Sequence, residues 1–117
     1  MKGRNVSATE KRYHDLLATV IGCVACWKER GERNCFVSIH HVDGRTKPDA
    51  HWLVLPLCAG HHQDNGTAIA VHPWKARFEL AYGSQRTLVA ECAMQLLDMG
   101  HELPARLAEI IGLEVAA

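Results

Sequence analysis

The sequence has no long apolar run and no secretory leader, and these absences exclude several common classes of protein. No apolar stretch approaches the roughly 18–20 residues that a membrane-spanning helix requires. The opening residues, MKGRNVSATEKRYH, contain no apolar segment of the kind that a signal peptide needs. We therefore expect a protein of the cytoplasm that has no membrane partner.

The sequence also has no net charge, because 13 lysines and arginines balance 13 aspartates and glutamates. The charges are distributed unevenly: residues 1–50 carry nine basic and six acidic side chains, and residues 51–117 carry four and seven. Affinity for nucleic acid depends mainly on local contacts with phosphates. A neutral total therefore lowers the expectation of tight non-specific binding without excluding a nuclease, and the N-terminal half is the basic side.

The number of cysteines is odd, which argues against a disulfide framework. There are five of them, and an odd count in a chain without a secretory leader argues against structural disulfides. Cys23 and Cys26 are separated by two residues, a spacing that lets two thiolates face one metal ion. The H-E-x-x-H signature is absent as well, which disfavours a general zinc hydrolase.

A chain of 117 residues predicts one domain with a modest core. Residues 35–41 and 53–57 are rich in strand-forming side chains, whereas the polar stretch 27–34 is expected to be a surface loop. We expect an α+β fold in which a two-stranded β-ribbon has flanking helices. The expected parts are a mobile basic arm (1–7), an N-terminal helix (8–22), a central core (23–66) and C-terminal helices (72–117).

Local signals predict where several helices begin. Ser7 and Glu10 form a capping box for the first helix, and Ser84 caps a later one. Cys92 lies on the apolar face of that later helix and is expected in the core. Pro73 is expected in the first turn of another helix, where its missing amide proton costs nothing.

A second pair of metal-binding side chains, Cys58 and His61, repeats the two-residue gap of Cys23 and Cys26. Three thiolates and one imidazole make a tetrahedral set for a structural zinc ion. The alternative is that Cys23 is merely buried beside a helix end. Cys35 is a possible replacement ligand, although at the start of a strand a small buried residue is the expected role.

Five of the eight histidines lie in residues 38–63, and four of these form two adjacent pairs. His40 and His41 follow each other on an expected strand, where successive side chains point to opposite faces. One imidazole can then face a metal ion while the other acts on water, as hydrolysis of a phosphodiester requires. The alternative is one buried and one solvated strand histidine, which the nearby pair His61–His62 disfavours.

Three stretches, SIHHVDGRTKP, VLPLCAGHHQ and VHPWKARFELAYG, carry a resemblance to known proteins. The first histidine pair, a loop, a strand and then Cys58 with His61–His62 resemble the HNH (ββα-metal) endonuclease motif over about residues 23–65. Over residues 14–97 the sequence more closely resembles the RecA-dependent nucleases of the bacteriophage recombination enhancement function (Ref) family. The resemblance implies a small zinc-braced ββα-metal core and hydrolysis of DNA in a bacterial host cell.

The resemblance also implies roles for individual histidines. His40 and His62 match the positions that hold a catalytic divalent ion, Mg²⁺ or Mn²⁺, and His41 matches the general base. His51 is the nearest match to the middle HNH position, although its spacing to Cys58 is longer than usual. A metal ligand, a phosphate contact and a loop histidine are the other interpretations of His51.

Several further residues and partners complete the hypothesis. His72 is either a buried histidine at a helix start or a further metal ligand, to a second zinc ion. Arg45 and Lys47 lie in the loop between the strands and are the expected phosphate contacts, with Lys75 and Arg77 as weaker candidates. The resemblance implies DNA as substrate and a RecA filament as partner. The alternative function is a non-catalytic zinc-binding module that binds nucleic acid or protein.

Overall fold

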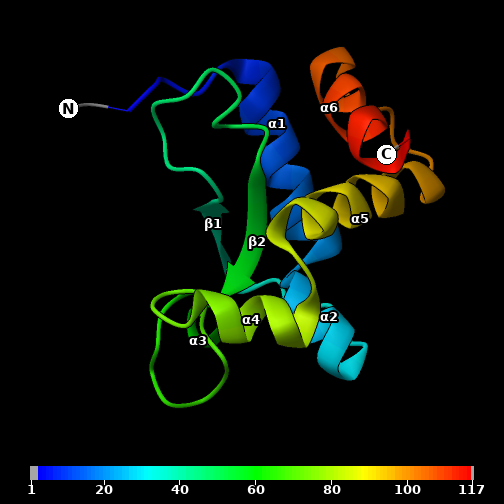
Figure 1. Ribbon diagram of the computed structural model, residues 1–117. Coiled ribbons are helices and arrows are strands. Elements are labelled where there is room, and N and C mark those ends of the chain that lie inside the picture. Colours follow the sequence, from blue (N-terminus) through cyan, green and yellow to red (C-terminus); the bar gives the residue numbers. More distant parts are fainter. Residues whose placement is uncertain (1–2, 117) are drawn as a thin grey trace.

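A two-stranded antiparallel ribbon lies at the centre of the fold, with helices packed around it (Figure 1). The computed structural model describes residues 3–116. The elements in chain order are α1 (Ala8–Leu16), the π-helical turn η1 (Leu17–Ile21), α2 (Val24–Arg30), β1 (Val37–His41), β2 (Val54–Cys58), α3 (Ala59–His62), α4 (Lys75–Tyr82), α5 (Gln85–Asp98) and α6 (Ala105–Ala116). The predicted α+β fold with a two-stranded ribbon and flanking helices is therefore confirmed.

Strand β2 is the inner strand of the ribbon. Val54 and Leu55 are fully buried, and β2 packs against η1, α2 and α5. Strand β1 is only partly buried, and His40 is its buried position. The register pairs His40 with Leu55 and His41 with Val54, so the two histidines point to opposite faces of the ribbon, as predicted.

The first helix begins at the predicted capping box. The Ser7 hydroxyl accepts a hydrogen bond from the Glu10 amide, and the Glu10 carboxylate accepts one from the Ser7 amide. After η1 the chain turns at Gly22, where φ is +72°. A side chain here would also collide with the main chain, because a Cβ would lie 2.7 Å from the carbonyl oxygen of Asn34. Only glycine satisfies both conditions.

The polar stretch 27–34 is only partly a loop, so the prediction of a surface loop throughout is wrong. Helix α2 runs as far as Arg30, and Gly31 ends it with φ at +69°. The helix starts at Cys23, whose thiol accepts a hydrogen bond from the Cys26 amide at 3.4 Å. Cysteine is not among the usual capping residues, so the sequence carried no recognisable start signal for this helix.

Pro73 precedes a helix but does not lie in its first turn, contrary to the prediction. Helix α4 begins at Lys75. Before it the chain is paired with residues that follow β2: the His72 amide donates to the His62 carbonyl at 3.1 Å, and the His72 carbonyl accepts from the Asp64 amide at 3.0 Å. This pairing competes with helix formation and holds His72 beside His62.

Helix α5 supplies much of the core. Its cap is the predicted Ser84, whose hydroxyl accepts from the amide three residues on. Cys92 and Leu96 on its inner face are fully buried, as is Leu107 of α6, and the core role predicted for Cys92 is confirmed. Within the described part of the chain, every helix is too short or too polar to span a bilayer.

Leu96→Ala is expected to lower the free energy of unfolding by about 2–5 kcal/mol, because it leaves a cavity at a fully buried site. Leu80→Ala is the matched control, since it makes the same change at a helical side chain that is 89% exposed. The control should change stability by less than about 0.5 kcal/mol. Chemical denaturation measures both differences, and equal effects would contradict the packing of α5 against the ribbon.

Candidate functional site

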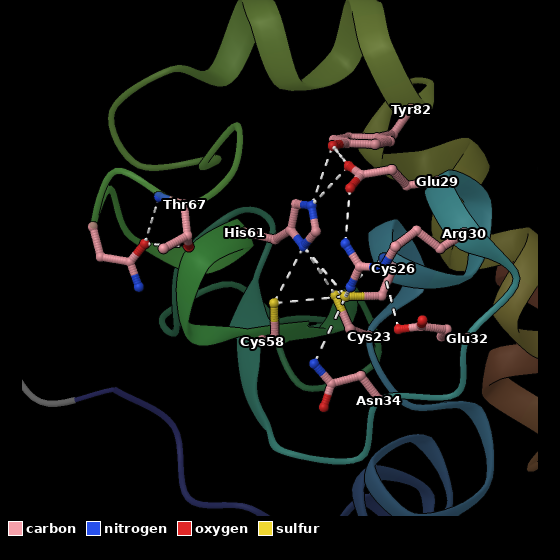
Figure 2. Close-up of polar contacts among 11 residues, drawn as sticks. Cys23, Cys26, Glu29, Arg30, Glu32, Asn34, Cys58, His61, Thr67 and Tyr82 are labelled. Carbon is pink, nitrogen blue, oxygen red and sulfur yellow. Dashed lines mark hydrogen bonds and ion pairs between the residues drawn. The ribbon is translucent and has the colours of Figure 1, made fainter.

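Three sulfurs and one imidazole converge where β2 ends and α2 begins (Figure 2). The donor atoms of Cys23, Cys26, Cys58 and His61 all lie within 4.8 Å of one another. Nδ1 of His61 is 3.2 Å from the Cys58 sulfur and 3.5 Å from the Cys23 sulfur. The Cys26 and Cys58 sulfurs are 3.8 Å apart, which is about the separation of two thiolates bound to one tetrahedral zinc ion. This cluster can bind zinc.

Two side chains donate hydrogen bonds to one sulfur of the cluster. Nη2 of Arg30 donates to the Cys26 sulfur at 3.2 Å, and Nδ2 of Asn34 donates to the same sulfur at 3.7 Å. The Cys23 thiol has no such cation beside it, and burial raises its pKa to about 12. A bound cation would offset this penalty, so the deprotonated cluster and the metal stabilise each other.

The far side of the His61 ring is held by two side chains that the sequence did not indicate. Nε2 of His61 lies 3.1 Å from the Tyr82 hydroxyl and 3.3 Å from Oε2 of Glu29. The Tyr82 hydroxyl also donates to Glu29 at 2.5 Å. Figure 2 shows this pair on the side of the ring opposite the sulfurs. These contacts direct Nδ1 of His61 towards the sulfurs, as outer partners of metal-bound histidines do.

A second cluster of donors consists of three imidazoles, those of His40, His62 and His72, whose nitrogens lie within 4.8 Å of one another. The rings are close, with centroids 5.3 Å apart for His40 and His62 and 5.0 Å apart for His40 and His72. They come from β1, α3 and the extended segment before α4. The structure therefore brings His72 into the same cluster as His40 and His62, the two ligands that the family resemblance implies.

Each of two imidazoles in this three-histidine cluster has one nitrogen occupied. His40 lies with Nε2 2.7 Å from Oε1 of Gln85, and the amide nitrogen of Gln85 donates to Glu79 at 3.2 Å. Because Gln85 turns its carbonyl oxygen to the ring, His40 is the donor and keeps its lone pair on Nδ1. Nδ1 of His62 lies 2.6 Å from the Ser38 hydroxyl, which leaves Nε2 facing the cluster.

His41 points to the other face of the ribbon, where it meets His51 and His14. Nε2 of His41 lies 3.0 Å from Nδ1 of His51. The buried His14 on α1 donates from Nε2 to the His51 carbonyl at 2.7 Å. His51, whose role the spacing left open, is 2% exposed and is thus a buried partner of His41.

His40, His41 and His62 are held in their neutral forms. Burial lowers the pKa of His41 to about 4, and the positive charge of Arg45 contributes to the shift. Burial likewise lowers the pKa of His40 and of His62. A neutral imidazole is what both a metal ligand and a general base require at pH 7.

One pocket of about 590 Å³ joins the three-histidine cluster to His41 and to positive charge. Arg45 and Lys75 are the cationic side chains of its wall, whereas Lys47 lies exposed on the same loop as Arg45. The full lining is Ile39, His40, His41, Val42, Gly44, Arg45, His62, Val71, His72, Pro73, Lys75 and Gln85. The pocket therefore combines three imidazoles that could hold a metal ion, a neutral imidazole and cations that an anionic substrate would meet.

Some of the residues at the site could be found from the sequence and others could not. Cys35, expected to be small and buried, is exposed and lies outside the zinc-binding cluster, with its thiol donating to the Thr19 carbonyl at 3.5 Å. His14, Ser38 and Gln85 were missed. Each contributes a single hydrogen bond across a long sequence separation, which no spacing rule anticipates.

Comparison with known families assigns most of the chain to a described family. A family model described as "Recombination enhancement, RecA-dependent nuclease" matches residues 6–97. The match includes the four donors of the zinc-binding cluster, the three-histidine cluster and His41. It ends at the close of α5, so α6 lies beyond the matched residues.

Cys26→Ser is expected to lower the zinc content by about one ion per chain and to lower the melting temperature sharply, because a structural zinc contributes directly to folding. Cys35→Ser is the matched control, since this thiol is exposed and outside the zinc-binding cluster. Elemental analysis and thermal denaturation measure the two effects. A metal-free protein with unchanged stability would refute the structural zinc.

Proposed function

The chain belongs to the recombination enhancement, RecA-dependent nuclease family, and on that premise we propose that it is a metal-dependent DNA endonuclease of the HNH type. The observation that carries the proposal is one pocket whose lining includes all three imidazole residues of the cluster together with His41 and Arg45. In HNH terms the ribbon and α3 form the ββα-metal core. A protein that used only the zinc-binding cluster would have no need of this second set.

We assign His40, His62 and His72 as the ligands of the catalytic ion. The observation that supports the fit is the direction of the free nitrogens, which Gln85 and Ser38 set by occupying the opposite nitrogens of His40 and His62. An all-imidazole set suits Zn²⁺ and related transition ions better than Mg²⁺, which prefers oxygen ligands. When bound there, such an ion supplies Lewis-acid stabilisation of the phosphate and of the leaving oxygen.

His41 is the proposed general base. It takes a proton from water, the resulting hydroxide forms a new bond to phosphorus, and the bond from phosphorus to the 3′ oxygen breaks. The products are a phosphate monoester and an alcohol, once the 3′ oxygen receives a proton from solvent. The lowered pKa of His41 keeps the ring neutral at pH 7, so that a lone pair is free for the proton, although the same shift makes the ring a weaker base. His51, 3.0 Å away, positions the ring and takes the place of the middle HNH residue.

The scissile phosphate needs positive charge as well. Arg45 and Lys75 line the pocket from the loop between the strands and from the start of α4. We propose that these two cations contact the phosphate nearest the reaction, and that Lys47 contacts the backbone further along the DNA. The dependence on a RecA filament is proposed from the family description, with DNA in the bacterial cytoplasm as the substrate.

Three histidine variants separate the assigned roles. His41→Ala should lower the cleavage rate about 10²–10⁴-fold, because only transition-state proton transfer is lost, while zinc content and melting temperature stay unchanged. His62→Ala should also abolish cleavage, and a higher concentration of metal should restore part of it. His61→Ala should instead lose zinc and stability. Plasmid nicking with Zn²⁺, Mn²⁺ or Mg²⁺, with and without RecA filaments, measures the rates.

The outcomes of this comparison are distinct. If His61→Ala is stable but inactive and His62→Ala is unstable, the second histidine pair is assigned the wrong way round. If all three variants cut DNA at the wild-type rate, the endonuclease proposal fails. A wild-type protein that binds zinc and DNA but cuts under none of these conditions would favour the non-catalytic module.

Arg45→Ala is expected to reduce cleavage more than Lys47→Ala does, because Arg45 lines the pocket and Lys47 is exposed outside it. Both side chains lie on one loop and both changes remove one positive charge, so each variant controls for the other. Binding of DNA by both should also lose part of its salt dependence. Cleavage rates at several salt concentrations test this, and normal rates for both variants would remove the loop from the phosphate-binding surface.

A further inference from the structure

The N-terminal segment packs against the loop that joins the two strands. The Arg4 amide donates to the Arg45 carbonyl at 2.8 Å, and Nε of Arg4 donates to the Thr46 carbonyl at 2.8 Å. Gly3 approaches the loop so closely that a Cβ would lie 2.6 Å from the Cβ of Arg45. The stretch expected to be a mobile arm therefore makes defined contacts from position 3 onward, while positions 1 and 2 lie outside the described residues.

The carbonyl of Arg4 completes a chain of hydrogen bonds that ends at His41. It lies 2.7 Å from Nε2 of His51, and because a carbonyl only accepts, His51 carries its proton on Nε2. In the neutral His51 ring Nδ1 then accepts, and its partner at 3.0 Å is Nε2 of His41. His41 therefore donates from Nε2 and keeps the lone pair of a base on Nδ1.

His51 has few alternatives to this arrangement. Its backbone carbonyl is fixed by the hydrogen bond from His14 at 2.7 Å, and its side chain is almost completely buried. Loss of the Arg4 carbonyl would leave a buried N–H without an acceptor, which is costly. The ring would relieve that cost by moving its proton to Nδ1, and His41 would then have to accept at Nε2 and protonate Nδ1.

We infer that the main chain of Arg4 is a positioning element of the active site: by accepting from His51, it sets which nitrogen of His41 takes the proton from water. The inference rests on the proposed function, because that function makes His41 the base. It also makes the docking of Gly3 and Arg4 on the loop a condition for full activity. A partner that draws this segment away would slow the reaction without displacing either metal ion.

The tautomers themselves are the first test, and they need no substrate. Long-range ¹H–¹⁵N correlation spectra of the full-length, zinc-loaded protein should show His51 and His41 protonated on Nε2. Arg4→Pro removes the amide donor to Arg45 and the side-chain bond to Thr46, so it should free the segment and produce Nδ1-protonated forms of both rings. Gly3→Ala should act in the same direction through its clash with Arg45. The exposed neighbour Asn5 supplies the control, Asn5→Ala, whose spectrum should match the wild type.

The second test measures whether Arg4 acts through His51. Arg4→Pro should lower kcat for DNA cleavage about 10-fold with KM changed less than about twofold, because orientation rather than binding is lost. In a His51→Ala background the same substitution should have no further effect. Residues that act through one chain of contacts are non-additive in such a cycle. Zinc content and melting temperature establish that each variant is folded.

Each result decides the inference. Unchanged tautomers in folded Arg4→Pro and Gly3→Ala would overturn it, and so would multiplicative effects of Arg4→Pro and His51→Ala on kcat. If the wild-type protein cuts no DNA, the proposed function fails, yet the spectra still report whether Arg4 sets the protonation of His51 and His41. The failure of one proposal is therefore distinguishable from the failure of the other.

Discussion

The structure depends on the convergence of Cys23, Cys26, Cys58 and His61 on one point. Two strands alone are marginally stable in water, and a helix as short as α3, with four residues, does not form independently. The zinc-binding cluster ties α3 to the end of β2 and to the first turn of α2. Glu29 and Tyr82 extend this connection to α4, because they hold the outer nitrogen of His61. The geometry of everything attached to α3 follows from this junction.

Successive side chains of β1 point to opposite faces of the ribbon, so the two histidines of this strand have different neighbours. His40 points into the three-histidine cluster and His41 points to His51. On both faces the protein controls an imidazole in the same way, by giving one nitrogen a partner and leaving the other free. Gln85, Ser38 and the main chain of Arg4 are these partners. The orientation of each ring is thus set by a hydrogen bond to a neighbouring residue.

The sequence predicted what is encoded by short spacings. The two pairs of donors that meet in the zinc-binding cluster, the capping residues Ser7 and Ser84, and the opposite orientations of His40 and His41 depend on neighbours within a few positions. Two predictions of helix position failed, at α2 and at Pro73, because a thiol served as the cap in one case and strand-like pairing replaced the helix in the other.

Hydrogen bonds between residues far apart in the chain could not be predicted from sequence spacing, because tertiary packing decides which residues meet. Gln85 reaches His40 across 45 positions, and His14 reaches His51 across 37. The place of His51 could not be settled from the sequence for the same reason: its distance to Cys58 along the chain says little about how the intervening loop folds. The family resemblance implied roles for His40, His41 and His62. The residues that hold these histidines in place are brought to them only by the tertiary fold.

The two metal-binding sets share one short segment, since His61 belongs to the zinc-binding cluster and His62, the next residue, belongs to the three-histidine cluster. A helix turns by about 100° per residue, so neighbouring side chains face different directions. One inserted or deleted residue between Cys58 and His62 would therefore misplace a ligand of both sets at once. Length variation in this family should be confined to loops such as 42–53 and 63–70, and the five residues from Cys58 to His62 should be inherited as a unit of constant length.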